Sequence, residues 1–144
     1  MNLRPATLAD APRIAALSDA LGYPNTPAII AERLERLLPS ASDLILVATM
    51  PPDRVIGWVH ANAQDLLDSG RRAEILGLVV DPDWQGRGAG RYLVEAVEAW
   101  ARELGLPTLA VRSNIVRAQS HPFYERIGFE RFKTQHSYRK SLQS

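Results

Sequence analysis

The chain has 144 residues, of which 46% are hydrophobic and 23% charged, with a formal net charge of +1. This length and composition predict one globular domain with a single core. There is no cysteine, which excludes disulfides, cysteine metal sites and a cysteine nucleophile. The nearly neutral charge gives no indication of nucleic-acid or membrane binding, and we expect neither.

The first residues, Met1 to Pro5, lack the apolar core of a signal peptide, and no apolar run approaches the length of a membrane span. The sequence therefore predicts a cytoplasmic protein. We also find no internal repeat, low-complexity tract or linker, so we expect residues 1–144 to form one domain.

The first half of the chain has clear helix signals between its expected strands. Pro12 is tolerated only in the first turn of a helix, which favours a start near Asp10, and Gly22 ends that helix. Thr26 and Pro27 are a typical N-cap and first residue of a second helix. The expected elements are a strand at 2–6, helices after Asp10 and from Pro27, and strands at 44–49 and 55–63.

The second half has one strongly amphipathic helix, at 91–104, closed by Gly105 and Pro107. The expected elements there are a strand at 72–80, this helix, a strand at 108–112, a helix around Tyr124 and a final strand at 131–140. The complete order is therefore β-α-α-β-β-β-α-β-α-β.

Three glycines at alternate positions, Gly86, Gly88 and Gly90, separate the strand 72–80 from the following helix. Such a turn exposes main-chain N–H groups at a helix N-terminus, where an anion is favoured, and predicts a phosphate or pyrophosphate ligand. A P-loop would need Lys-Ser/Thr where this chain has Arg91-Tyr92, and a dinucleotide fingerprint would need glycine at position 91. A purely structural turn remains the alternative.

The pattern Gln85-x-x-Gly88-x-Gly90 after an apolar strand resembles the acyl-CoA pyrophosphate loop of the GNAT (general-control-related) N-acetyltransferase superfamily. The resemblance implies an α/β (α+β) fold, with a mixed central sheet of about six to seven strands flanked by about four helices. The element order, extended to β-α-α-β-β-β-α-β-α-β(β), is that of the superfamily.

A second segment resembles the C-terminal helix and turn of the same superfamily. It contains Phe123-Tyr124-Glu125 followed by Gly128-Phe129, and it lies at the expected distance after the glycine loop. Residues 123 and 127 share one helical face, and Gly128 is a plausible residue to end the helix. Two motifs in the right order and separation support the resemblance.

The resemblance implies transfer of an acetyl group from acetyl-CoA to a primary amine of a small molecule, by direct attack in a ternary complex. It implies no metal, and it is compatible with a homodimer. The positions that match cofactor-binding residues are Leu78, Val79, Val80, Gln85, Gly86, Arg87, Gly88, Ala89, Gly90, Arg91, Asn114 and Tyr124. Asn114 would hydrogen-bond the pantetheine arm, and main-chain N–H groups of residues 78–80 would polarise the thioester carbonyl, with Gly77 as a bulge.

Two side chains match catalytic positions of the superfamily. An aliphatic amine with a pKa of about 10.4 is mostly protonated at neutral pH, so a base is useful. Glu74 matches the general base of some members, and its alternative is an ion pair with Arg71 or Arg72. Tyr124 matches the tyrosine that protonates the coenzyme A thiolate, and its alternative is a core aromatic.

The acceptor site is not marked by a motif. Candidate residues are 21–25, Trp58, His60, Gln135, His136 and Tyr138, each of which is equally suited to packing or to an exposed surface. A catalytically silent acyl-CoA-binding module, a protein or peptide acetyltransferase and a nucleotide-binding domain remain alternatives for the function.

Overall fold

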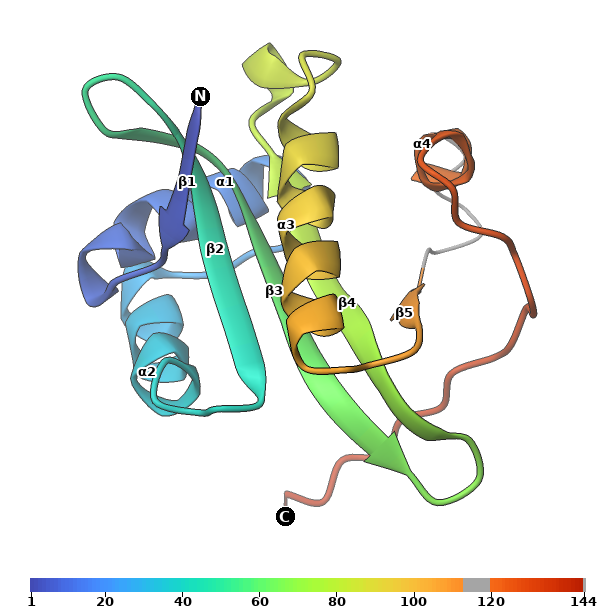
Figure 1. Ribbon diagram of the computed structural model, residues 1–144. Helices are drawn as coiled ribbons and strands as arrows, with labels where there is room; N and C mark the ends of the chain where they lie inside the picture. The colour runs from blue at the N-terminus through green and yellow to red at the C-terminus, as the bar shows by residue number, and fades with distance from the viewer. Residues whose placement is uncertain (113–119, 144) are drawn as a thin grey trace. The chain divides into compact units, whose positions relative to one another are not determined.

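The computed structural model describes residues 1–112 and 120–143. The chain forms two units, residues 1–112 and residues 113–144, and each is described here by itself. The first unit contains β1 (Asn2–Pro5), α1 (Ala11–Ala20), α2 (Pro27–Leu37), β2 (Asp43–Met50), β3 (Arg54–Leu66), β4 (Gly70–Val80), α3 (Ala89–Glu103) and β5 (Leu109–Val111), with 3-10 turns at Leu8–Asp10 and Pro82–Trp84 (Figure 1).

The helix signals in the first half of the sequence are confirmed. Pro12 lies in the first turn of α1, and Gly22 follows the helix with a φ of +86°. The Thr26 hydroxyl accepts a hydrogen bond from the Ile29 N–H at 3.2 Å, so Thr26 caps α2 at its expected start.

The strands form one mixed sheet with the order β1-β2-β3-β4-β5. The first three pairings are antiparallel, whereas β4 and β5 run parallel. Helices α1 and α2 cover one face of this sheet, and α3 covers the other (Figure 1). The order of elements through α4 is the predicted one, and the α/β fold class is confirmed.

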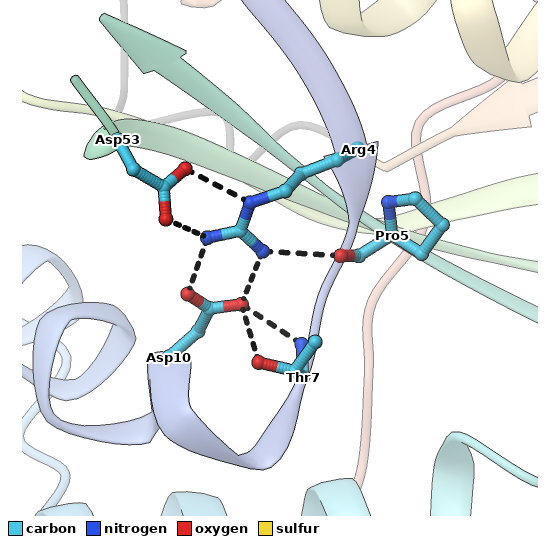
Figure 2. Close-up of polar contacts among 5 residues, drawn as sticks. All are labelled: Arg4, Pro5, Thr7, Asp10 and Asp53. Atoms are coloured by element: carbon cyan, nitrogen blue, oxygen red, sulfur yellow. Dashed lines mark hydrogen bonds and ion pairs between the residues drawn. The ribbon is translucent and has the colours of Figure 1, made fainter. Parts of the chain in front are cut away.

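Arg4 of β1 connects three parts of the first unit (Figure 2). Its guanidinium donates to both carboxylate oxygens of Asp10 at 2.8 Å, and it also pairs with Asp53 at 3.1 Å. Asp10 additionally accepts a hydrogen bond from the Thr7 N–H at 2.8 Å. The Arg4 guanidinium holds the pKa of the Asp10 carboxyl below its usual value, so this ion pair is maintained at neutral pH.

A bulge interrupts β4 where the sequence predicted one. His60 of β3 pairs with Gly77, but the next residue, Ala61, pairs with Ile75, so Leu76 is the extra residue. Gly77 is required there for another reason: a Cβ at this position would lie 2.8 Å from the indole ring of Trp58. The bulge therefore lies directly under an aromatic side chain.

The second unit contains α4 (Ser120–Arg126), and Gly128, with a φ of +101°, ends it as predicted. The expected final strand at 131–140 is wrong, because residues 129–143 adopt no regular secondary structure. A strand requires a neighbour for its N–H and C=O groups, and among the described residues none pairs with this segment. The sheet consequently has five strands in the described ranges, fewer than the expected six to seven.

No helix within residues 1–112 and 120–143 combines the length and the apolar character needed to cross a membrane.

Candidate active site

The end of β4 is anchored by Asp81, a buried residue that the sequence did not mark as functional. Its carboxylate accepts a hydrogen bond from the Asp83 N–H at 2.9 Å. It also forms an ion pair with Arg13 of α1 at 2.6 Å. Arg13 also donates to the Val55 carbonyl at 2.8 Å, so one side chain joins α1, β3 and the start of the glycine loop. The hydrogen bond from Asp83, together with the Arg13 pair, lowers the pKa of Asp81.

The glycine loop is exposed and open. Gly86 and Gly88 have φ values of +77° and +89°, and no described atom lies within 4 Å of where their Cβ atoms would be. Glycine is therefore needed for the backbone conformation, and the space beside the loop is open to a ligand.

The helix after the loop begins at Ala89, two residues before the expected start at Arg91, so Ala89 and Gly90 belong to its first turn. Boundaries from sequence patterns are less certain than the elements themselves, and alanine is a strong helix former. The first intrahelical bond joins the Tyr92 N–H to the Gly88 carbonyl at 2.9 Å. The N–H groups of residues 89–91 precede this bond and have no intrahelical acceptor, which makes this end of α3 suitable for phosphate oxygens.

Two arginines add positive charge to the loop. Arg87 lies over the ring of Trp84, with 4.9 Å between its guanidinium carbon and the ring centroid. Arg91 pairs with Glu95 at 3.0 Å, and both side chains are largely exposed. Gln85 bonds the Val80 carbonyl at 3.3 Å, which connects the loop to the end of β4. The predicted loop residues are thus gathered at one place.

The last residues of β4 have an unpaired edge. The ladder to β5 covers only Ala73 to Ile75, so among the described residues no strand pairs with residues 76–80 on that side. The Asp81 N–H donates to the Ile56 carbonyl of β3. Because main-chain groups alternate in direction, the N–H groups of Leu78 and Val80 are directed toward the unpaired edge, whereas that of Val79 is directed toward β3.

Glu74 is buried, and both of its carboxylate oxygens have partners. One oxygen lies 3.4 Å from Arg72 and 3.6 Å from Arg112, and the other accepts a hydrogen bond from Gln64 at 3.3 Å. The sequence left open whether Glu74 is a general base or the partner of an arginine, and the structure shows the ion pair with Arg72. The carboxylate in this pair is buried. Both oxygens of Glu74 are therefore already in contact with guanidinium or amide groups of this unit.

In the second unit, Tyr124 of α4 is partly buried between two other aromatic rings. Its ring centroid lies 5.2 Å from that of Phe123 and 5.6 Å from that of Phe129, both in edge-to-face geometry. The Phe129 N–H donates to the Tyr124 carbonyl at 3.0 Å, which closes the turn after the helix. Asn114 lies outside the described residues.

The sequence interpretation missed two ion pairs that the sheet brings together. One is Arg13–Asp81, and the other joins His60 Nε2 of β3 to Asp43 Oδ1 of β2 at 2.7 Å. His60 was a candidate acceptor residue, but nothing in the sequence marked Asp43 as its partner. The alternation of His60, Asn62 and Gln64 along β3 was the only available signal, and it does not give the register.

Comparison with known proteins decides the family. The model of the Acetyltransferase (GNAT) family matches residues 16–129, which is most of the chain. The chain belongs to the GNAT acetyltransferase family. The resemblance noted in the sequence is therefore confirmed, and with it the assignment of the protein as an N-acetyltransferase.

Two relatives illustrate the range of this GNAT protein's similarities. An aminoglycoside N(6′)-acetyltransferase type 1 of Stenotrophomonas maltophilia is 31% identical over 133 residues, covering 90% of this chain and 86% of that protein. A mycothiol acetyltransferase of Rhodococcus erythropolis is 32% identical over 97 residues, covering 66% of this chain but only 32% of that protein.

A solved structure supports the GNAT fold. The aminoglycoside acetyltransferase AAC(6′)-Iy, in complex with the bisubstrate analogue CoA-S-monomethyl-acetylneamine, superposes with a TM-score of 0.85 and 21% identity. The match covers 98% of each chain. At this identity the similarity establishes the fold.

Proposed function

We propose that the protein transfers an acetyl group from acetyl-CoA to a primary amine of a small molecule by direct attack in a ternary complex. The observation that carries the proposal is the open glycine loop at the N-terminus of α3, directly after the unpaired edge of β4. Loop N–H groups and two arginines suit a pyrophosphate, and the N–H groups of Leu78 and Val80 suit the pantetheine arm and the thioester carbonyl.

The reaction requires two protons to leave the acceptor nitrogen. The first leaves the ammonium ion, which frees the lone pair for attack on the thioester carbon. A tetrahedral intermediate forms, its oxyanion accepts main-chain hydrogen bonds, and the carbon–sulfur bond then breaks. The departing thiolate takes a proton from Tyr124, and the second nitrogen proton restores the phenol. The net products are the N-acetyl amide, coenzyme A and one proton.

The small-molecule acceptor is supported by two relatives, whose names refer to an aminoglycoside and to mycothiol, both small molecules. A panel of amines that includes neamine, mycothiol-type thiols with free amines, polyamines, amino acids and lysine peptides tests the proposal. Release of coenzyme A is followed with a thiol reagent for acceptors without a thiol, and the products are separated by chromatography for the thiol acceptors. Turnover with a small amine supports the proposal, and turnover with peptides alone supports a protein acetyltransferase. Acetyl-CoA binding without any turnover indicates a silent binding module.

The cytoplasmic location and the homodimer stay predictions.

Replacing Gly88 by alanine is expected to remove most of the stabilisation that acetyl-CoA gives to the folded protein. A ligand that binds only the native state adds RT ln(1 + [L]/Kd), about 2.7 kcal/mol at a hundredfold excess over Kd. A side chain at Gly88 strains the backbone at its φ of +89° and occupies the space beside the loop. Thermal unfolding with and without acetyl-CoA measures the effect.

Gly105 provides the matched control for this experiment. It has a φ of +71°, it also has no described atom near its Cβ position, and it lies at the other end of α3. Gly105→Ala should lower the unfolding temperature by a similar amount but keep the acetyl-CoA shift. Equal shifts in both variants would contradict the loop as the cofactor site.

Glu74 is part of the proposal as a general base, and Glu74→Gln tests it. A base contributes about 10²- to 10⁴-fold to turnover, and its loss should shrink at high pH, where solvent already supplies the free amine. Turnover between pH 7 and pH 10 is the measurement. A loss that stays constant with pH would instead assign Glu74 to anchoring Arg72 and Arg112.

A further inference from the structure

His60 and Asp43 form a partly buried pair on the face of the sheet that α1 and α2 cover. His60 pairs with Ile45 in the register of β2 and β3, and Ile45 packs in the core beneath α1 and α2. The two side chains are 19% and 14% exposed, and 2.7 Å separates His60 Nε2 from Asp43 Oδ1. This short contact fixes the orientation of the imidazole ring.

The contact also decides which ring nitrogen can accept a proton. Nε2 donates to the Asp43 carboxylate, so Nδ1 carries the lone pair in the neutral ring. Nδ1 has no hydrogen bond to any residue in the described ranges. Glu74, on the same face, differs in this respect, because both of its oxygens already have cationic or amide partners.

The pair lies beside the part of β4 proposed to hold the acetyl group. His60 is directly across from Gly77, the residue at the bulge, and Gly77 precedes Leu78 in β4. Neighbouring strands are about 4.8 Å apart. Gly77 has no side chain, and the ring of Trp58 occupies the space where its Cβ would be.

Trp58 gives a second observation at the same place. Its ring covers Gly77 on the face that carries His60, and its buried Nε1 has no hydrogen-bond partner among the described residues. A buried indole N–H is normally paired, so an unpaired one beside the reaction site suits a hydroxyl or carbonyl oxygen of an acceptor. Trp58 and His60 thus both lie next to Gly77 on the same face of the sheet.

We infer that His60, oriented by Asp43, takes the first proton of the acceptor ammonium, a role for which Glu74 is the alternative, and that Trp58 Nε1 donates to a polar oxygen of the same molecule. This inference rests on the proposed function. The Nδ1 lone pair takes one proton from the ammonium, which leaves a neutral amine and an imidazolium held by Asp43. The imidazolium then releases that proton to solvent, and the second nitrogen proton follows the route through Tyr124.

Other charged groups on this face include Glu74, Arg72 and Arg112, which form their own network, and two further ion pairs, Arg13–Asp81 and Arg4–Asp10. Glu74 pairs with Asn62 in the ladder, two positions along β3 from His60. Asp43 is thus the carboxylate in contact with the imidazole, and it stabilises the imidazolium once the proton has moved.

Three single variants test the inference. His60→Gln keeps an N–H donor for Asp43 but removes the basic nitrogen. Asp43→Asn keeps the shape of the partner but removes its charge. Asp65→Asn is the matched control, because Asp65 is an exposed carboxylate on β3 whose position in the strand alternation places it on the opposite face. The value of kcat/KM is measured with acetyl-CoA and neamine, or with the best amine of the panel, at several pH values.

His60→Gln should lower kcat/KM by about 10²-fold at neutral pH, and this loss should shrink as the pH approaches the pKa of the amine. Asp43→Asn should show a smaller loss with the same trend, and Asp65→Asn should show none. Full activity of His60→Gln, or an equal loss at every pH, would overturn the inference while the proposed function stands. If the wild-type protein acetylates no amine, the proposed function fails and the inference fails with it.

Discussion

Replacing Tyr124 by phenylalanine is expected to lower kcat by about 10²-fold or more, while KM for acetyl-CoA changes little. The substitution removes only the hydroxyl, so the edge-to-face contacts of the ring with Phe123 and Phe129 remain. Folding should therefore be nearly unaffected. The missing donor leaves the coenzyme A thiolate without its proton, which raises the barrier to cleavage of the carbon–sulfur bond.

Tyr92→Phe is the control, because Tyr92 has an exposed side chain on α3 and its hydroxyl has no proposed role. A thioester with a more acidic thiol should reduce the effect of Tyr124→Phe, since a more stable thiolate needs its proton less. Steady-state kinetics with both donors measures this difference. A Tyr124→Phe enzyme with full kcat would identify Tyr124 as a core aromatic.

Asp10→Asn is expected to lower the free energy of unfolding by about 2 kcal/mol at neutral pH, because charge-assisted hydrogen bonds to Arg4 are lost. Arg4 depresses the pKa of Asp10 in the folded state. A depressed carboxyl pKa stabilises the protein above the unfolded value of about 3.9, and this stabilisation disappears as the pH falls through the folded value. The wild type and the variant should therefore converge in acid.

Asp53→Asn is the internal comparison, because Asp53 contacts the same guanidinium but its side chain is 63% exposed. Exposed ion pairs contribute about 0–1 kcal/mol, so this variant should change stability little at any pH. Urea unfolding from pH 2 to pH 7 gives both curves. A constant difference between wild type and Asp10→Asn across this range would show that packing, and not charge, accounts for the loss.

The elements that the sequence predicted well are those with local causes. Thr26 and Pro27 begin α2, Gly22 and Gly128 end helices, and each signal depends on a few neighbouring residues. The glycine loop was predictable for the same reason, because positive φ values favour glycine and Gly86 and Gly88 both have them. The family followed from two such local motifs.

The sequence could not predict the ion pairs between residues that are far apart in the chain, because these depend on how the strands and helices are aligned. Asp43 meets His60, and Arg13 meets Asp81, only because the sheet and α1 bring together residues far apart in the chain. Glu74 shows the same limit, because the Arg112 contact depends on how β5 pairs with β4. The strand expected at 131–140 is wrong for a similar reason, because a strand needs a pairing partner and none pairs with this segment among the described residues.

The extra residue Leu76 gives β4 a break in phase. Core-side positions follow one another at intervals of two up to Glu74, then at an interval of three to Gly77, and again at two to Val79. In a variant that lacks Leu76, core-side and opposite-side residues would alternate along β4 without a break. All remaining residues of β4 could then keep their present partners in β3. Because a bulge bends its strand, this one extra residue redirects β4 just before Leu78 and Val80, the residues whose N–H groups are directed toward the unpaired edge.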